Sequence, residues 1–102
     1  MAKLVVMYSK PADAAAFDDY YFKKHVPLAK TIPGLRAYEV SKGAVATPQG
    51  PSPYHLIATL TFDSMEAIGA AFASKEGQAT AADVGKFAQA GVQMLMFETG
   101  TV

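Results

Sequence analysis

The sequence predicts an α+β fold in which four antiparallel strands form one sheet and the helices cover one of its faces. Apolar residues recur at strand spacing in four segments and at helical spacing between them. The segments follow the order strand, helix, strand, strand, helix, strand, which is typical of the split β-α-β arrangement of a ferredoxin-like sandwich. A length of 102 residues suits one core. We therefore expect a single domain over residues 1–102.

The first strand is expected over Lys3–Ser9, where Leu, Val, Met and Tyr follow one another without polar alternation. Such a run is typical of a strand that is buried on both faces. Pro11 ends it, because proline lacks the N–H that a sheet requires. A helix should then begin at Asp13, which is a good N-cap, and run to about His25.

The middle of the chain predicts a stop, a turn, a strand and a loop. Pro27 should stop or kink the helix near Val26, although a last turn can follow. Residues 32–35 form a turn, and Arg36–Lys42 alternates as a half-exposed strand near an edge does. Residues 43–53 contain three prolines and two glycines, and we expect them to form a long mobile loop.

The segment Tyr54–Phe62 is the clearest strand. Strict alternation would place Tyr54 on an apolar face together with Leu56, Ala58, Leu60 and Phe62. The opposite face would then carry His55, which could line a surface between subunits. Both assignments depend on the alternation holding over the whole segment.

The last third of the chain predicts two helical segments and a final strand. Asp63 is the expected N-cap of the first helix, with Glu66 completing a capping box. Gly77 should interrupt the helix, and Gln78–Gln89 should form a further one with Val84 and Phe87 directed inward. The final strand, Val92–Glu98, is apolar on both faces.

Four strands with helices on one face leave the other face to be covered. Val5, Met7, Ile57 and Leu95, or their neighbours, would meet water there, and each is worth about 1.5–3 kcal/mol when buried. A patch of this kind exceeds what a soluble monomer usually exposes. We therefore expect two copies to pair through their sheets about a two-fold axis. A terminal segment or the 43–53 loop could cover the face instead.

Composition excludes several classes of function. Nine basic and nine acidic residues give a net charge of zero without a basic stripe, so we expect no nucleic-acid partner. The absence of cysteine excludes disulfides and thiol catalysis. No segment has the roughly 20 apolar residues of a membrane span, and no signal peptide is recognisable, so a cytoplasmic location without membrane contact is the expectation.

His25 is the main candidate for a chemical role, because it shares an inward helical stripe with Phe17, Tyr21 and Leu28. An inward imidazole next to a pocket can act as an acid or base near neutral pH. A core histidine bonded to a backbone carbonyl is the alternative. For His55 a structural role is favoured. Histidine and carboxylate spacings predict no metal site.

Five tyrosines could donate hydrogen bonds to a carbonyl-bearing ligand, although most are expected to pack in the core. Arg36 is the single arginine and could hold an anionic substrate, but a surface role is favoured. Phosphate-binding loops, dinucleotide fingerprints and nucleophile elbows are absent from the sequence.

Several blocks of residues, spread over nearly the whole chain, together form a recognisable pattern. They are Leu4–Tyr8, Phe17, Tyr20, Tyr21, His25–Leu28, Ile32–Leu35 and Leu60–Ala67. In these blocks the sequence resembles the EthD-like family, named for the degradation of ethyl tert-butyl ether. The block from His25 to Leu35 is moderately specific, whereas the strand patterns are weak. The resemblance implies a dimeric α/β barrel, in which two ferredoxin-like protomers pack through their sheets.

The resemblance also implies a function and a site. Superfamily relatives include muconolactone isomerases, polyketide cyclases or dehydratases and cofactor-free monooxygenases, so no cofactor is expected. His25 inherits a position facing a cleft, with Tyr8, Phe17, Tyr21 and Leu28 as expected substrate contacts. We expect a protein that acts on or binds a small, largely apolar metabolite in a catabolic pathway; as an enzyme it would be a cofactor-free isomerase, dehydratase or monooxygenase with His25 as acid or base. The alternatives are a carrier or accessory protein of an oxygenase system and a haem-binding protein with His25 or His55 as axial ligand.

Overall fold

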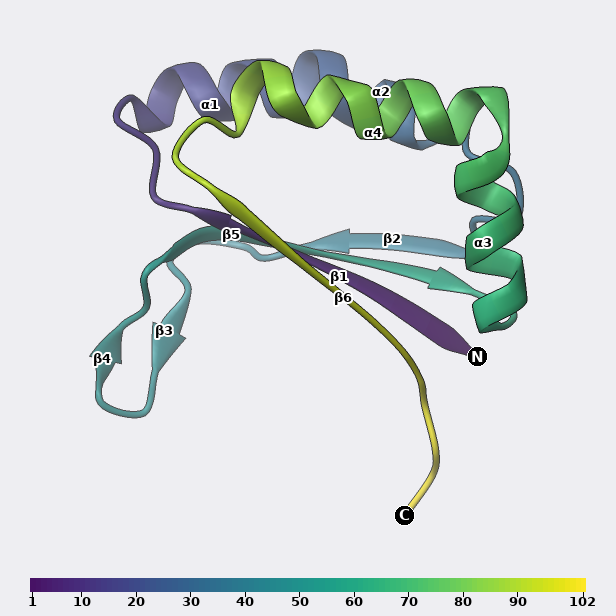
Figure 1. Cartoon of the computed structure of the whole chain (residues 1–102). Helices are drawn as coiled ribbons and strands as arrows, with labels where there is room; N and C mark the ends of the chain where they lie inside the picture. Colours follow the sequence, from purple (N-terminus) through teal and green to yellow (C-terminus); the bar gives the residue numbers. More distant parts are fainter.

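A computed structural model describes residues 1–102 and shows one four-stranded antiparallel sheet with all helices on one face (Figure 1). This confirms the predicted fold class. The strands are β1 (Ala2–Ser9), β2 (Ala37–Val40), β5 (Tyr54–Phe62) and β6 (Val92–Glu98), with a small hairpin of β3 (Ala46–Thr47) and β4 (Gly50–Pro51). The helices are α1 (Ala14–Tyr20), the π-helical turn η1 (Tyr21–His25), α2 (Val26–Ala29), α3 (Met65–Ala73) and α4 (Lys75–Phe87).

The strand order in the sheet is β2-β5-β1-β6, with β1 paired to both β5 and β6. The half-exposed strand β2 lies at one edge, as its alternating sequence predicts. The apolar strand β6 lies at the other edge, where most of its side chains stay exposed. The apolar strands β1 and β6 are therefore neighbours, and β6 forms an edge of the sheet that nothing covers.

A β-bulge corrects the prediction for the start of β5. Tyr8 pairs with Leu56 and Ser9 pairs with Tyr54, so His55 is an extra residue in the ladder. The bulge turns His55 toward Phe17 on the helix side, with ring centroids 5.1 Å apart. The Tyr54 hydroxyl instead donates to Gln93. Strict alternation was thus the wrong assumption for these two residues.

The first helix begins at the predicted N-cap, because the Asp13 carboxylate accepts a hydrogen bond from the Ala16 N–H. It continues past Pro27 to Ala29, so the chain follows the alternative of a last helical turn and does not stop at Val26. The intervening residues widen into the π-helical turn η1, where the Val26 N–H reaches the Tyr21 carbonyl oxygen. A wider turn accommodates a proline that offers no N–H of its own.

The second pair of helices differs from prediction in its caps. Ser64, not Asp63, caps α3 by accepting from the Ala67 N–H. The interruption falls at Ser74 and not at Gly77, and Ser74 caps α4. Gly77 lies in the first turn of α4, where a Cβ atom would collide with the backbone of Ala71. The glycine thus permits two helices to approach closely and does not break one of them.

The structure forms the small β3–β4 hairpin where the sequence indicated an irregular loop over residues 43–53. The hairpin and the C-terminus both extend away from the helices (Figure 1). Neither of them covers Leu95 or Phe97, which stay 54% and 44% exposed. The alternative in which this chain covers its own second sheet face is therefore wrong.

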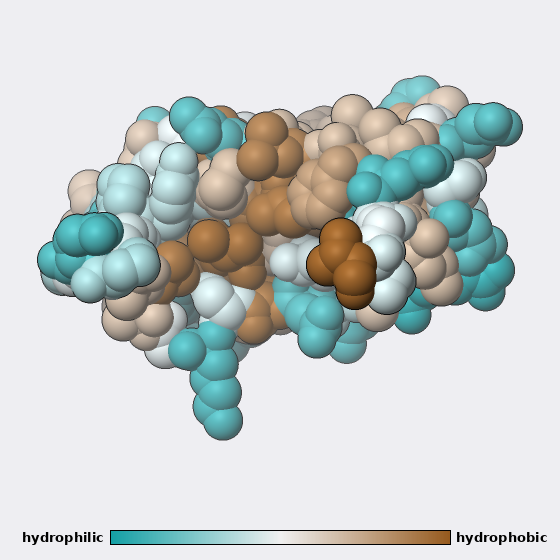
Figure 2. Space-filling model, turned by 90° about the horizontal axis from the view of Figure 1, so that it is seen from below, coloured by the Kyte–Doolittle hydropathy of each residue, from teal (hydrophilic) through white to brown (hydrophobic).

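The core lies between the sheet and the helices. Alternate residues of β1 (Leu4, Val6 and Tyr8) are buried there, whereas Val5 and Met7 are only half-buried. The sequence predicted that β1 is buried on both faces, but in the single chain only one face of β1 is buried, because nothing covers the other. Figure 2 shows hydrophobic residues gathered on that side. We call it the open face, made up of Val5, Met7, Ile57, Leu95 and Phe97.

No helix in the structure combines the length and apolar character needed to cross a membrane.

Candidate functional site

A pocket of about 410 Å³ lies between the sheet and the helices, on the side opposite the open face. Its volume falls within the range of roughly 300–1,000 Å³ typical of small-molecule sites. Sixteen of its nineteen lining residues are hydrophobic, so any ligand that fills it must be largely apolar. Strands β1, β2, β5 and β6 form one wall, and η1, α2, α3 and α4 form the other.

His25 reaches the pocket from the π-helical turn and is 4% exposed. Its Nδ1 lies 3.0 Å from Oδ2 of Asp83 on α4, which is also buried. Its Nε2 has no hydrogen-bond partner in the chain. Every fully buried polar side-chain atom of the chain does have such a partner, so Nε2 is not fully buried. Nε2 is therefore accessible from the pocket and is free to contact a ligand.

The charge state of this pair follows from its surroundings. Burial lowers the pKa of His25 below its ordinary value of 6.5, and the hydrogen bond to Asp83 only partly offsets that shift. Burial acts to raise the pKa of Asp83, but hydrogen bonds from Tyr20 and His25 outweigh it and keep that pKa below its ordinary value. At neutral pH a neutral imidazole thus donates from Nδ1 to a carboxylate, and Nε2 is an acceptor.

Asp83 is held from a second side. The Tyr20 hydroxyl donates to Oδ1 of Asp83 at 2.7 Å, and the Lys86 ammonium lies 3.9 Å from the same oxygen. The Phe87 ring packs against the His25 ring at a centroid distance of 4.7 Å. These contacts fix the orientation of the imidazole, as a base in a catalytic pair requires.

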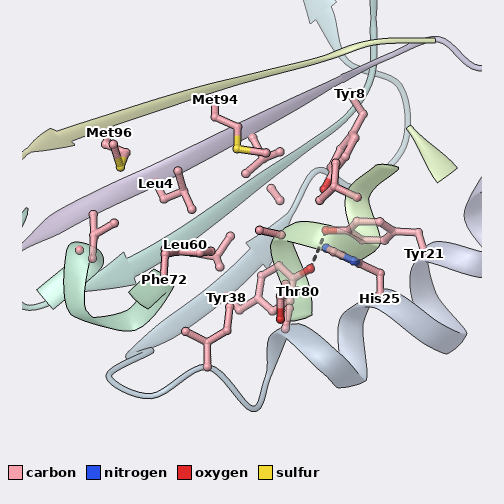
Figure 3. Close-up of a pocket in the computed structure, with 18 of the residues that line it drawn as sticks. Leu4, Tyr8, Tyr21, His25, Tyr38, Leu60, Phe72, Thr80, Met94 and Met96 are labelled. Atoms are coloured by element: carbon pink, nitrogen blue, oxygen red, sulfur yellow. Dashed lines mark hydrogen bonds between the residues drawn. The ribbon is translucent and has the colours of Figure 1, made fainter. Parts of the chain in front are cut away.

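Three tyrosines place hydroxyl groups at the same end of the pocket (Figure 3). The hydroxyls of Tyr21 and Tyr38 are 2.6 Å apart and share one hydrogen bond. The hydroxyl of Tyr8 makes no hydrogen bond within the chain and is therefore open to the pocket. Burial is the main cause that raises the pKa of each of these hydroxyls, so all three act as neutral donors.

The structure brings together only some of the residues proposed from sequence. His25, Tyr8 and Tyr21 converge on the pocket. Phe17 is buried in the aromatic cluster behind it, and Leu28 is half-buried with its carbonyl oxygen bonded to Thr31. Neither Phe17 nor Leu28 lines the pocket, so we leave both out of the proposed ligand contacts.

The remaining candidates have structural partners away from the pocket. His55 bonds through Nε2 to Asp18 at 2.7 Å and ties β5 to α1. Arg36 forms a two-point ion pair with Asp63, which explains why Asp63 does not cap α3. Both arrangements join neighbouring elements near the surface, where the side chains stay partly exposed.

Sequence reasoning missed Asp83 and Thr80, and it considered Tyr38 only as one of five tyrosines that could reach a ligand. The spacing of Thr80, Asp83, Val84 and Phe87 places all four on one face of α4, and all four are buried. Asp83 was detectable as a carboxylate within an inward stripe, next to Val84 and Phe87. Its partner His25 lies 58 positions away in the sequence, so the pairing itself required the fold.

The charged side chains do not gather into a metal site. No group of three or more His, Cys, Asp or Glu residues is placed to hold a metal ion. Of the two histidines, His55 has Nε2 engaged by Asp18, and His25 alone offers a free Nε2 to the pocket.

Comparisons with known proteins agree on the family. Residues 9–91 match the model of the EthD domain. An uncharacterized 11.0 kDa protein from the thcB-thcC intergenic region of Rhodococcus erythropolis is 45% identical over 102 residues, covering 100% of this chain and 98% of that protein.

Solved structures extend the similarity. An ethyl tert-butyl ether degradation (EthD) family protein from Bacillus halodurans c-125 is 36% identical, covers 98% of this chain and 99% of its own, and superposes with a TM-score of 0.90. SnoaB, a cofactor-independent oxygenase from Streptomyces nogalater, is 12% identical over 99% of this chain and 94% of its own, with a TM-score of 0.68. At that identity the likeness concerns the fold alone.

Proposed function

The chain belongs to the EthD domain family, and on that premise we propose that it binds a small, largely apolar metabolite and uses His25 as a general base. One observation carries this proposal: a buried imidazole presents an unpartnered Nε2 to an apolar pocket while Asp83 holds its other nitrogen. An imidazole that is neutral at working pH can accept a proton at once.

The chemistry follows from the same geometry. Nε2 of His25 takes a proton from a carbon next to a carbonyl group or from a phenolic hydroxyl. The electron pair moves onto the ligand oxygen, where the Tyr8 hydroxyl donates a hydrogen bond to the developing charge. Asp83 stabilises the imidazolium that forms. The proton can then return to another carbon or to a leaving hydroxyl, which is the step that cofactor-free isomerases and dehydratases share.

A monooxygenase reaction would start in the same way, with the resulting carbanion or phenolate reacting with dioxygen. SnoaB is a cofactor-independent oxygenase, which supports the view that this fold can host such chemistry. The proton-abstraction step is common to all three reaction types, so it is the part of the mechanism that we propose.

A non-catalytic carrier is the second candidate, and the apolar lining of the pocket favours it. Only one end of the pocket has polar side chains (Figure 3). A protein that delivers a hydrophobic metabolite to an oxygenase needs such a pocket, and His25 would then only hydrogen-bond the ligand.

Hydrogen–deuterium exchange separates the two candidates. Neutral cyclic ketones and lactones are incubated with the protein in D₂O, and loss of the signals of the C–H groups next to their carbonyls is followed by NMR. We expect the protein to accelerate exchange of at least one compound, and His25→Gln to reduce that acceleration by about 100-fold or more.

The matched control is His55→Gln, which removes the other histidine together with its carboxylate contact. We expect its exchange rate to equal that of the unaltered protein. Compounds that bind without accelerated exchange would establish the carrier function. Full acceleration by His25→Gln would refute the general-base role.

We also propose that two copies pair through the open face to form a homodimer. Leu95 and Phe97 expose 54% and 44% of their surface on this side, next to the half-buried Val5, Met7 and Ile57. Apolar side chains gathered on one face favour burial against an equal face.

Sedimentation tests the dimer directly. At micromolar concentration we expect twice the mass of the 10.8 kDa chain. Leu95→Glu should shift the population to monomer, because it places a charge within the open face. The control is Met94→Glu, one residue earlier on β6, which alters the pocket side of the strand and should leave the dimer intact.

A further inference from the structure

We propose that the pocket selects neutral ligands that carry their oxygen at one end, and that it rejects carboxylates. This inference rests on the proposed function in so far as it concerns the same pocket, but it is decided by binding and not by catalysis. The structural basis is that polar groups are unevenly distributed along the pocket wall.

The polar side chains gather at one end of the pocket. Figure 3 shows Tyr8, Tyr21, His25, Tyr38 and Thr80 on one side of the cavity, with Leu4, Leu60, Phe72 and Met96 on the other. A ligand that matches this wall has an oxygen-bearing head and a hydrocarbon ring or chain as its body. Burying the body supplies most of the affinity, and the head fixes the orientation.

The charge around the polar end disfavours an anion. No lysine, arginine or acidic residue lines the pocket. The nearest buried charge is the Asp83 carboxylate, which is bonded to the far side of the His25 ring. A carboxylate in the ligand would therefore lose its hydration without gaining a cation, and it would face a like charge. Protonating His25 to compensate is opposed by burial of the ring.

The free donors and acceptors match a hydroxyl or an enolisable carbonyl. Tyr8 has an unused hydroxyl donor, whereas His25 offers an acceptor at Nε2. The Tyr21 and Tyr38 pair uses only one of its two hydroxyl protons internally, so one remains available. Thr80 gives its proton to the Glu76 carbonyl oxygen. A phenol can donate to Nε2 and accept from Tyr8 at the same time.

Two probes with the same pentylphenyl body and different head groups test the inference by calorimetry near pH 7.5. They are 4-pentylphenol, which is neutral at that pH, and 4-pentylbenzoate, which is ionised. We expect the phenol to bind at least about tenfold more tightly, because the carboxylate must be desolvated without a counter-charge. The affinity for the benzoate should rise as the pH falls toward the pKa of the acid.

Two matched variants test whether the phenol binds with its hydroxyl at the polar end of the pocket. Tyr8→Phe removes a hydroxyl that has no partner within the chain, so the fold should survive, and we expect binding to weaken by roughly two- to tenfold. Tyr54→Phe removes a hydroxyl that donates to Gln93 outside the pocket and should leave the affinity unchanged.

Equal affinity for the two probes, tighter binding of the benzoate, or no binding of the phenol up to its solubility limit would overturn the inference. The general-base proposal fails separately. A preference for the phenol without any His25-dependent exchange supports the ligand class and refutes the catalytic role. Exchange that depends on His25, without a preference for the neutral probe, supports the catalytic role and refutes the ligand class.

Discussion

The molecule contains two histidine–aspartate pairs in different surroundings. His25 meets Asp83 at 3.0 Å, and His55 meets Asp18 at 2.7 Å. The side chains of the first pair are 5% and 8% exposed, whereas those of the second are 22% and 48% exposed. Both histidine rings contact the same aromatic cluster, one through Phe87 and the other through Phe17.

The difference indicates that burial, and not the length of the hydrogen bond, separates the pair that we propose to be reactive from the structural one. The bond between His55 and Asp18 is the shorter one, but it uses Nε2 to join two elements near the surface. The longer bond between His25 and Asp83 uses Nδ1 and leaves Nε2 for a ligand in an apolar pocket. A low-dielectric site strengthens every electrostatic effect of that pair.

The largest expected difference between the pairs is in stability. Asp83→Ala removes a buried carboxylate and leaves Tyr20 and His25 without their partner. We expect the free energy of unfolding to fall by about 3 kcal/mol, as for other buried pairs that lose one member. Asp18→Ala breaks an exposed pair and should cost less than about 1 kcal/mol. Urea unfolding of both variants measures the two values.

Equal losses of stability in these two variants would break the comparison. A second variant, Asp83→Asn, keeps the side-chain volume and one acceptor oxygen but removes the charge. It should fold more stably than Asp83→Ala and still lose His25-dependent exchange, because the imidazolium formed during the reaction is no longer stabilised.

The pH dependence of stability gives the next largest difference. Because the pKa of folded His25 lies below 6.5, the unfolded chain takes up a proton at this residue first as the pH falls. Stability should therefore decline as the pH falls below about 6.5, and this contribution levels off below the folded pKa. Asp83 has a lowered pKa, so its contribution is present above its unfolded value of 3.8 and is lost as the pH falls through its folded pKa.

Denaturant unfolding between pH 5 and pH 8 checks the upper window. His25→Gln should flatten the decline below pH 6.5, whereas His55→Gln should leave the His25 contribution in place. A decline that is unchanged in His25→Gln would mean that another group carries it.

The smallest expected effect concerns Tyr20, which reaches Asp83 from the side opposite His25. Tyr20→Phe removes a donor that helps to keep the pKa of Asp83 low. The carboxylate then attracts the imidazolium more strongly, so the pKa of His25 should rise slightly. NMR titration of the imidazole signals measures this shift, and Tyr54→Phe is the matched control. A lower pKa of His25 in Tyr20→Phe would contradict the proposed network.

The sequence predicted the fold class, the order of helices and strands along the chain and the inward position of His25, because these depend on periodicity. Inward spacing placed His25 and Tyr21 on the same side of the helix, and both line the pocket. The same spacing placed Phe17 and Leu28 with them. Phe17 does lie on that side, because its ring stacks on Tyr21 at 5.8 Å, but it packs behind the pocket and not in its wall. Leu28 follows the widened turn at Tyr21–His25, and because a π-turn adds one residue, a stripe drawn at 3.6 residues per turn does not hold across it.

The pairs themselves could not be predicted from the sequence. Asp83 and His25 meet because α4 packs beside η1, and that contact joins distant parts of the chain. His55 was misplaced because a bulge shifts the alternation of β5 by one residue. Asp63 does not cap α3 as expected, because its carboxylate binds the guanidinium of Arg36 instead. In each case a tertiary partner outweighed a local preference.

Nitrogen-15 NMR of the two imidazole rings near pH 7.5 tests the central claim most directly, since ¹⁵N shifts show which nitrogen carries the proton. For His25 we predict a neutral ring with the proton on Nδ1 and a bare Nε2. A proton on Nε2, or a fully protonated ring at that pH, would remove the base from the pocket and contradict the proposed chemistry.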